Sequence, residues 1–284
     1  MRTTFKEDPS FTAWGPFIKQ SYDVQTITRN DIIIAGCVFG AAMSLALLAI
    51  FMGIQQTKAS RRPFKSAYIW MVWIELAACI VIAMICLLYL LKYIRPSFYF
   101  YMAILLLWSI QVQLLLQIII NRIRVILADR KKGRNLIITV AVLITLINIS
   151  VYCIWIPARL EISTRYVHIN DVWDRIEKGI YLIIDGTLNW YFIHVVKVNL
   201  VNNGLEKYNS LVRFNQRIII VSLLMDVMII AAMSIPNGFV YAIFHPLAFL
   251  VKLNIEMCMA NLIRKIALGK SRNGNASFLN TFAS

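Results

Sequence analysis

Apolar residues occur in long runs along the whole chain, and short segments between the runs hold most of the polar and charged residues. Each run has roughly twenty residues, enough for a helix to cross about 30 Å of hydrocarbon. Backbone amides in lipid must hydrogen-bond within their own segment, which favours helices over open sheets. The pattern predicts an all-α, polytopic membrane helix bundle with seven transmembrane helices, over residues 32–54, 67–91, 98–121, 136–157, 179–200, 218–236 and 239–263.

The predicted spans form one domain without an evident internal repeat. Residues 1–31 are expected to be an extramembrane N-terminal segment and residues 32–266 the seven-helix transmembrane domain. Residues 267–284 are rich in Ser, Asn and Gly, which predicts a disordered tail. Pro236, Asn237 and Gly238 form a strong turn signal between the sixth and seventh spans.

Composition supports a membrane protein, because 60% of the residues are hydrophobic and only 15% are charged. The net charge of +15 comes from short basic clusters between the apolar runs, a placement that indicates membrane topology rather than nucleic-acid binding. Segments 55–66, 122–135, 197–217 and 264–284 carry most of the Lys and Arg residues, so we expect them in the cytosol. This places the N-terminus outside or in a lumen and the C-terminus in the cytosol. We expect the endoplasmic reticulum or another endomembrane rather than the plasma membrane.

Polar side chains at membrane depth are the candidate functional groups. A charge at the bilayer centre costs about 2.5–3.5 kcal/mol, so such residues usually face the bundle interior. At 1.5 Å of rise per residue, Glu75, Asp226, Glu256 and Gln113 each lie about 10–12 Å from the predicted cytosolic face. Asp185 lies about 9 Å from the opposite face. The first four would form a polar layer contributed by four helices.

Spacing along each helix predicts which of these groups share a face. The pairs one turn apart are Lys252 with Glu256, Gln113 with Gln117, and Asp185 with Asn189. The alternative for the amides is a purely structural bond between helices, worth about 0.6–2 kcal/mol. The Lys252–Glu256 pair can likewise be only structural. Trp108, Trp190 and Tyr191 are deep enough to line a cavity, although packing or anchoring at the membrane interface is the commoner role of such residues.

Four stretches resemble a lineage of integral membrane proteins of filamentous fungi: IWIPAR (154–159), WDRIEK (173–178), DGTLNWYF (185–192) and HPLAFLVKLNIEM (245–257). The resemblance covers roughly residues 30–266. Some fungal multi-spanning proteins of this size and style are membrane-bound terpene cyclases of meroterpenoid pathways, of the ascochlorin/ascofuranone and macrophorin type. The resemblance implies cyclisation of a farnesyl-type chain on an aromatic or polyketide head in secondary-metabolite biosynthesis. It transfers no site residue.

A cyclase of this kind needs a carboxylic acid that protonates an epoxide or alkene inside a dry cavity, where burial keeps the acid neutral. Asp226, Glu75 and Glu256 are the candidate catalytic acids, with Asp185 if the site opens outward. Asp226 is favoured because no cationic residue adjoins it in the sequence. The candidate substrate-binding residues are Gln113, Gln117, Asn189, Trp108, Trp190, Tyr191 and Lys252. The reaction requires no cofactor and no metal, and the expected partners are a lipophilic small-molecule substrate and membrane lipid.

A seven-transmembrane receptor-like sensor is the alternative, and a G protein would be its partner. The number and direction of the spans fit a receptor. However, the third span ends in Asn121-Arg122-Ile123 rather than Asp/Glu-Arg-Tyr, and the seventh lacks Asn-Pro-x-x-Tyr. A proton-coupled or lipid transporter is a third hypothesis, and the absence of a visible repeat weakens it.

Overall fold

The computed structural model describes residues 12–18, 26–60, 62–127, 129–198, 209–234 and 238–281. These residues form seven α-helices, one short 3-10 helix (η1, Pro63–Lys65) and no strand. The helices are α1 (Arg29–Ala59), α2 (Ala67–Leu90), α3 (Phe98–Ile126), α4 (Arg130–Arg159), α5 (Thr164–Val196), α6 (Asn209–Ala232) and α7 (Gly238–Thr281).

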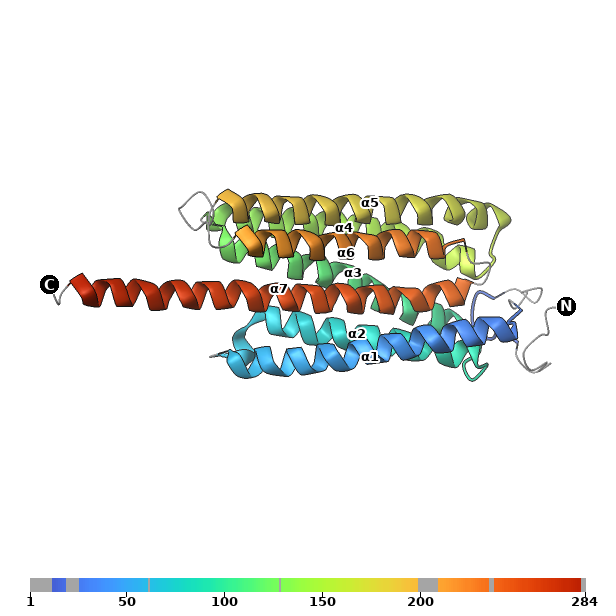
Figure 1. Ribbon diagram of the computed structural model, residues 1–284. Helices are drawn as coiled ribbons and strands as arrows, with labels where there is room; N and C mark the ends of the chain where they lie inside the picture. Colours follow the sequence, from blue (N-terminus) through green and yellow to red (C-terminus); the bar gives the residue numbers. More distant parts are fainter. Residues whose placement is uncertain are drawn as a thin grey trace.

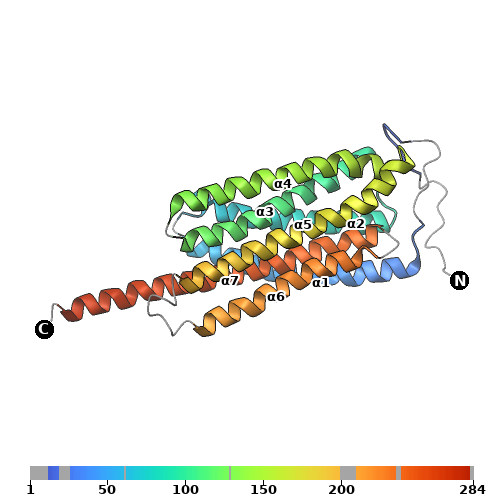
Figure 2. The same ribbon diagram turned by 90° about the horizontal axis from the view of Figure 1, so that it is seen from above.

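The helices run up and down through a single bundle (Figures 1 and 2). Helices α1, α3, α5 and α7 begin at one end of the bundle, which we call end A, and α2, α4 and α6 begin at the opposite end, end B. Six helices are long and apolar enough to cross a membrane, namely α1 to α5 and the part Val240–Leu262 of α7. The chain is therefore an all-helical membrane protein. Helix α6 packs on α5 and α7. That α6 crosses the membrane as a seventh span remains a prediction, and so does the side of the membrane that each end of the bundle faces.

Several helices extend beyond the predicted spans. Residues 158–178 were expected outside the membrane as a loop, but α5 already begins at Thr164, where the Ser163 hydroxyl accepts a hydrogen bond from the backbone N–H of Arg165. Helix α3 continues to Ile126, past the predicted end at residue 121. Hydropathy marks only the apolar part of a helix, whereas capping groups and charged turns extend it. Helix α7 continues to Thr281 and projects past the bundle at end B (Figure 1), so it includes much of the predicted tail.

Helix α7 lies at the centre of the bundle and packs on α1, α2, α3 and α6 (Figure 1). Helix α1 buries a stripe of small side chains that includes Ala35, Ala42, Ala46 and Ala49, all at most 2% exposed. Small residues let two helix backbones approach closely in a membrane. Polar bonds also join α1 to α7, since Gln56 Nε2 donates to the carbonyl of Met257 at 2.9 Å.

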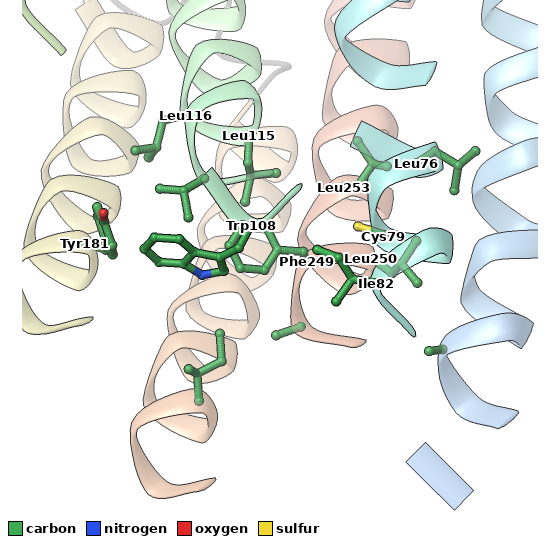
Figure 3. Close-up of a cluster of buried hydrophobic side chains, with 14 of the residues drawn as sticks. Leu76, Cys79, Ile82, Trp108, Leu115, Leu116, Tyr181, Phe249, Leu250 and Leu253 are labelled. Atoms are coloured by element: carbon green, nitrogen blue, oxygen red, sulfur yellow. The ribbon is translucent and has the colours of Figure 1, made fainter. Parts of the chain in front are cut away.

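The apolar core connects α2, α3, α5 and α7 (Figure 3). Trp108 of α3 lies between Tyr181 of α5 and Phe249 of α7 in this view, and its ring centroid is 6.0 Å from that of Tyr181. Trp108 is 8% exposed. The indole therefore occupies the position where three helices meet.

Candidate functional site

A buried lysine links three helices near the middle of the bundle. Lys252 of α7 donates hydrogen bonds from Nζ to Asp185 Oδ2 of α5 at 3.0 Å and to Asp226 Oδ1 of α6 at 2.6 Å. The side chains of Lys252, Asp185 and Asp226 are 5%, 3% and 13% exposed. The sequence spacing predicted Lys252–Glu256 as a pair on one helix face, but the lysine binds the carboxylates of α5 and α6 instead.

Asn189 extends this arrangement toward end B. Its Nδ2 donates to Asp185 Oδ1 at 3.0 Å, and its Oδ1 accepts a hydrogen bond from Arg122 Nη2 at 2.9 Å. The predicted alignment of Asp185 with Asn189 is therefore confirmed. Arg122 Nη1 lies 3.0 Å from Glu256 Oε1, and its guanidinium lies 4.0 Å above the centroid of the Phe192 ring. The Arg122–Glu256 contact is an ion pair by distance, although neither oxygen of Glu256 accepts a well-directed hydrogen bond from the described residues.

These contacts form one continuous group, the central network. Its members are Arg122, Asp185, Asn189, Asp226, Lys252 and Glu256. Two cations face three carboxyl groups, so one added proton makes the network neutral. Isolated net charge is very costly at low dielectric, which favours that neutral state.

Hydrogen bonding indicates which carboxyl group has room for this proton. Both oxygens of Asp185 accept hydrogen bonds, one from Asn189 and one from Lys252. Asp226 accepts from Lys252 through Oδ1 only, and its Oδ2 has no partner among the described residues. Asp226 Oδ2 is thus the free position on the Asp185–Lys252–Asp226 group.

Two small cavities lie between the network and end A. The Asp226 cavity has a volume of about 40 Å³ and is lined by Asp185, Asp226, Lys252 and mainly apolar groups, among them Trp108, Tyr181 and Phe249. The Arg159 cavity has a volume of about 60 Å³, and its polar lining includes Gln111, Arg159, Asp174, Glu177 and Tyr241. Trp108, Lys178 and His245 belong to both linings. These three side chains therefore separate the two cavities.

The residues around Lys178 are held by contacts within α5 and with α3. Lys178 Nζ lies 3.0 Å from Asp174 Oδ1, one turn earlier, and also contacts the Glu177 carboxylate. The same ammonium group lies 4.6 Å above the centroid of the Trp108 ring. These residues lie before the predicted fifth span, which began at residue 179, yet Glu177 and Lys178 are only 2% and 8% exposed.

Glu75 is buried but stands apart from the central network. Its side chain accepts a long contact of 3.8 Å from Cys79 Sγ, and Gln111 Nε2 donates to the same sulfur at 2.8 Å. No cation among the described residues forms an ion pair with Glu75. The predicted layer of Glu75, Asp226, Glu256 and Gln113 is therefore not one contact group.

Several candidate substrate-binding residues point away from the cavities. Gln113 borders a groove between α3 and α4 that also includes Ser109 and Asn148. Gln117 Nε2 donates to the carbonyl of Ile137 on α4 at 3.4 Å. Trp190 is 66% exposed and stacks on His194, and Tyr191 is half-buried beside it. Trp108, Asn189 and Lys252 are the predicted substrate-binding residues that the structure brings to the network or the cavities.

Arg122 is the network member that the sequence interpretation missed. Its position just after the third apolar run assigned it to a basic cytosolic loop, but α3 continues through it and the residue is only 4% exposed. A signal was present in the sequence, because Ile118, Ile119, Ile120 and Ile123 surround it with apolar neighbours. Lys178 was missed for the same reason, at the start of the fifth run.

No match was found to a protein-family model, a curated protein or a solved structure. Within the described part of the chain, no group of three or more His, Cys, Asp or Glu side chains is arranged to hold a metal ion.

The isolation of Glu75 leads to a stability prediction. We expect Glu75→Gln to change the free energy of unfolding by less than about 1 kcal/mol, because the amide has the same shape and no ion pair is lost. Glu256→Gln should cost more, since it leaves the buried Arg122 without its carboxylate. Denaturation in detergent, followed by circular dichroism, compares the two variants. Equal losses in both would contradict the assignment of the ion pair.

Proposed function

We propose that the protein is an intramembrane isomerase that cyclises a lipophilic isoprenoid substrate by protonating it, with Asp226 as the acid. The observation that carries the proposal is the position of Asp226 Oδ2. This oxygen has no partner among the described residues, belongs to a network one proton short of neutrality, and lies on a residue that lines the Asp226 cavity. In this proposal Lys252 and Asp185 position the acid, and Asn189 positions Asp185.

The reaction starts with transfer of the proton from Asp226 Oδ2 to an epoxide oxygen or an alkene carbon. In an epoxide an oxygen lone pair takes the proton, and the C–O bond then breaks with its electron pair staying on the oxygen. In an alkene the π electrons form the new C–H bond. Either step leaves a carbocation. The π electrons of a second alkene attack this cation and form the ring bond. Loss of a proton from the last cation to the Asp226 carboxylate restores both the acid and an alkene, so the product is an isomer of the substrate.

The lining of the Asp226 cavity supports a cationic intermediate. Trp108, Tyr181 and Phe249 line the cavity together with Asp226. Aromatic faces attract cations through the ring quadrupole, by about 0.5–2 kcal/mol for each contact. The proposed intermediate would thus meet aromatic side chains from three helices. Figure 3 shows how these three side chains lie relative to one another.

The two cavities are smaller than a prenyl chain requires. Volumes of about 40 and 60 Å³ are far below the roughly 300–1,000 Å³ of typical ligand pockets. A prenyl chain therefore requires the cavities to widen and join. Since Trp108 lies between them, rotation of its indole is the simplest movement that would do so.

A substrate screen tests the proposal. Microsomes that contain the protein are incubated with farnesyl-phenols and their terminal epoxides, and products are separated by chromatography. We expect an isomer of unchanged mass that control microsomes do not form. Recovery of unchanged substrate across the whole panel, with well-expressed protein, would count against it.

A receptor-like sensor is the second candidate, and one observation favours it. Arg122 joins α3 to α5 and α7 through Asn189 and Glu256 close to end B, and a buried cross-link of this kind can hold two helix arrangements apart. A sensor would recruit a G protein at end B in a ligand-dependent manner without converting any substrate. Co-purification with G-protein subunits, in the absence of isomer formation, would favour this candidate.

A further inference from the structure

Three cationic side chains line the two cavities, and they differ in their partners. Lys178 and Lys252 each contact at least one carboxylate of the chain itself. Arg159, at the end of α4, forms no ion pair with a carboxylate of the described residues. Its guanidinium lies 5.3 Å from the centroid of the Trp155 ring, and its Nε has no hydrogen-bond partner there. A carboxylate from outside the chain would give Arg159 the kind of partner that the other cations already have.

Other unpartnered polar groups line the same cavity. Tyr241 is 9% exposed and His245 is 7% exposed, and both belong to the lining together with Arg159. The Tyr241 hydroxyl and His245 Nδ1 have no hydrogen-bond partner among the described residues. Asp174 and Glu177, also in the lining, are already held by Lys178. The cavity therefore offers hydrogen-bond donors that the protein's own carboxylates do not use.

The start of α7 leaves room for the guanidinium. A Cβ atom at Gly238 would lie 2.8 Å from Arg159 Nη1 and 2.9 Å from Nη2, so any larger residue there would displace the arginine. The rest of the lining is mostly apolar, with Ile82, Leu105 and Val151, but it also includes Gln111 and Lys178. The cavity thus places the guanidinium beside a largely apolar wall.

We propose that the Arg159 cavity binds the carboxylate head of a lipid-soluble organic acid. Arg159 would pair with the carboxylate, and Tyr241 would donate its hydroxyl hydrogen to one of the carboxylate oxygens. Arg–carboxylate bonds are charge-assisted and roughly twice as strong as neutral ones. A volume of about 60 Å³ takes the head and its first carbons, while the apolar tail leaves through the mouth of the cavity. The Arg159 cavity is also one of the two that the proposed isomerase substrate would join, but binding of a carboxylate there does not require the isomerase reaction.

The test measures binding of radiolabelled hexanoate to the purified full-length protein in detergent by equilibrium dialysis. Hexanamide, which has nearly the same shape without the charge, should compete poorly. We expect Arg159→Gln to weaken hexanoate binding by about tenfold or more, the loss of one charge-assisted bond. Arg165→Gln is the matched control, because Arg165 is an exposed arginine near the same end of the bundle.

Two further variants keep the test independent of a folding defect in Arg159→Gln. Tyr241→Phe removes only the unpartnered hydroxyl, and Gly238→Ala keeps the charge but crowds the guanidinium. Both should bind hexanoate more weakly than the wild type and elute normally in size-exclusion chromatography. Hexanoate affinity that is unchanged in all three variants, or equal affinity for hexanamide, would overturn the proposal.

A second arm identifies the source of the acid. Dodecanoate is measured beside hexanoate with the same variants. Tighter, Arg159-dependent binding of dodecanoate would indicate a fatty acid drawn from the membrane, whereas equal affinity would indicate a small organic acid. Either result supports a carboxylate site.

Discussion

Arg122→Leu is expected to lower the free energy of unfolding by about 3–5 kcal/mol, the usual loss when one partner of a buried ion pair is removed. The substitution leaves Glu256, 2% exposed, without its cation, and Asn189 Oδ1 without its donor. Titration of the purified protein with a denaturing detergent measures the change. Arg124→Leu is the matched control on the same helix, because Arg124 is exposed, and it should change stability by no more than about 0.5 kcal/mol.

The double variant Arg122→Leu/Glu256→Leu separates loss of the ion pair from loss of packing. It should recover about 1–3 kcal/mol of the deficit, since no buried charge is left alone. Recovery should be incomplete because Asn189 Oδ1 still lacks a donor. If the double variant were as unstable as the sum of the two single variants, the Arg122–Glu256 pair would have no energetic significance.

Asp226→Asn is expected to reduce turnover by about 100- to 10,000-fold, the range for loss of a general acid. The asparagine side-chain oxygen can still accept the hydrogen bond from Lys252, and the amide imitates the neutral acid in shape. The variant network then has two cations and two carboxylates, Asp185 and Glu256. Stability and expression should therefore equal those of the wild type or exceed them. Product formation in microsomes, normalised to protein content, gives the result.

Asp171→Asn controls for the same chemical change at an exposed position of α5, and it should keep full turnover. Loss of turnover in Asp226→Asn together with poor expression would point to a structural role. Full turnover in well-expressed Asp226→Asn would remove the aspartate from the mechanism.

The sequence predicted the helices well because roughly twenty apolar residues in a row have few alternatives to a helix in lipid. The sequence predicted the ends of the helices less well where the terminal turns carry charged residues. Arg122 and Lys178 lie at the ends of apolar runs, where a hydropathy pattern cannot distinguish a loop from a buried turn of helix. Both residues became part of buried contacts once the neighbouring helices were in place.

Spacing on a helix predicted which residues share a face, but it did not predict which residue each side chain contacts. Asp185 and Asn189 do bond across one turn. Lys252 and Glu256 have the same spacing, yet they do not pair with each other. Lys252 contacts Asp185 and Asp226, whereas Glu256 contacts Arg122. Glu75 and Trp190 both lie in helices that are long and apolar enough to cross a membrane, but an estimate of depth carries no information about rotation of the helix. Trp190 faces outward, and Glu75 contacts Cys79 of its own helix, to which Gln111 of α3 donates a hydrogen bond, rather than the network.

Mass spectrometry of the product formed in D₂O tests the central claim most directly. Microsomes with the wild-type protein are equilibrated in D₂O and given a prenylated alkene. If Asp226 transfers its exchangeable proton to carbon, the cyclised isomer should carry one deuterium on carbon, and Asp226→Asn should form almost none of it. A cyclised product without deuterium, or a labelled product at wild-type yield from Asp226→Asn, would contradict protonation by Asp226.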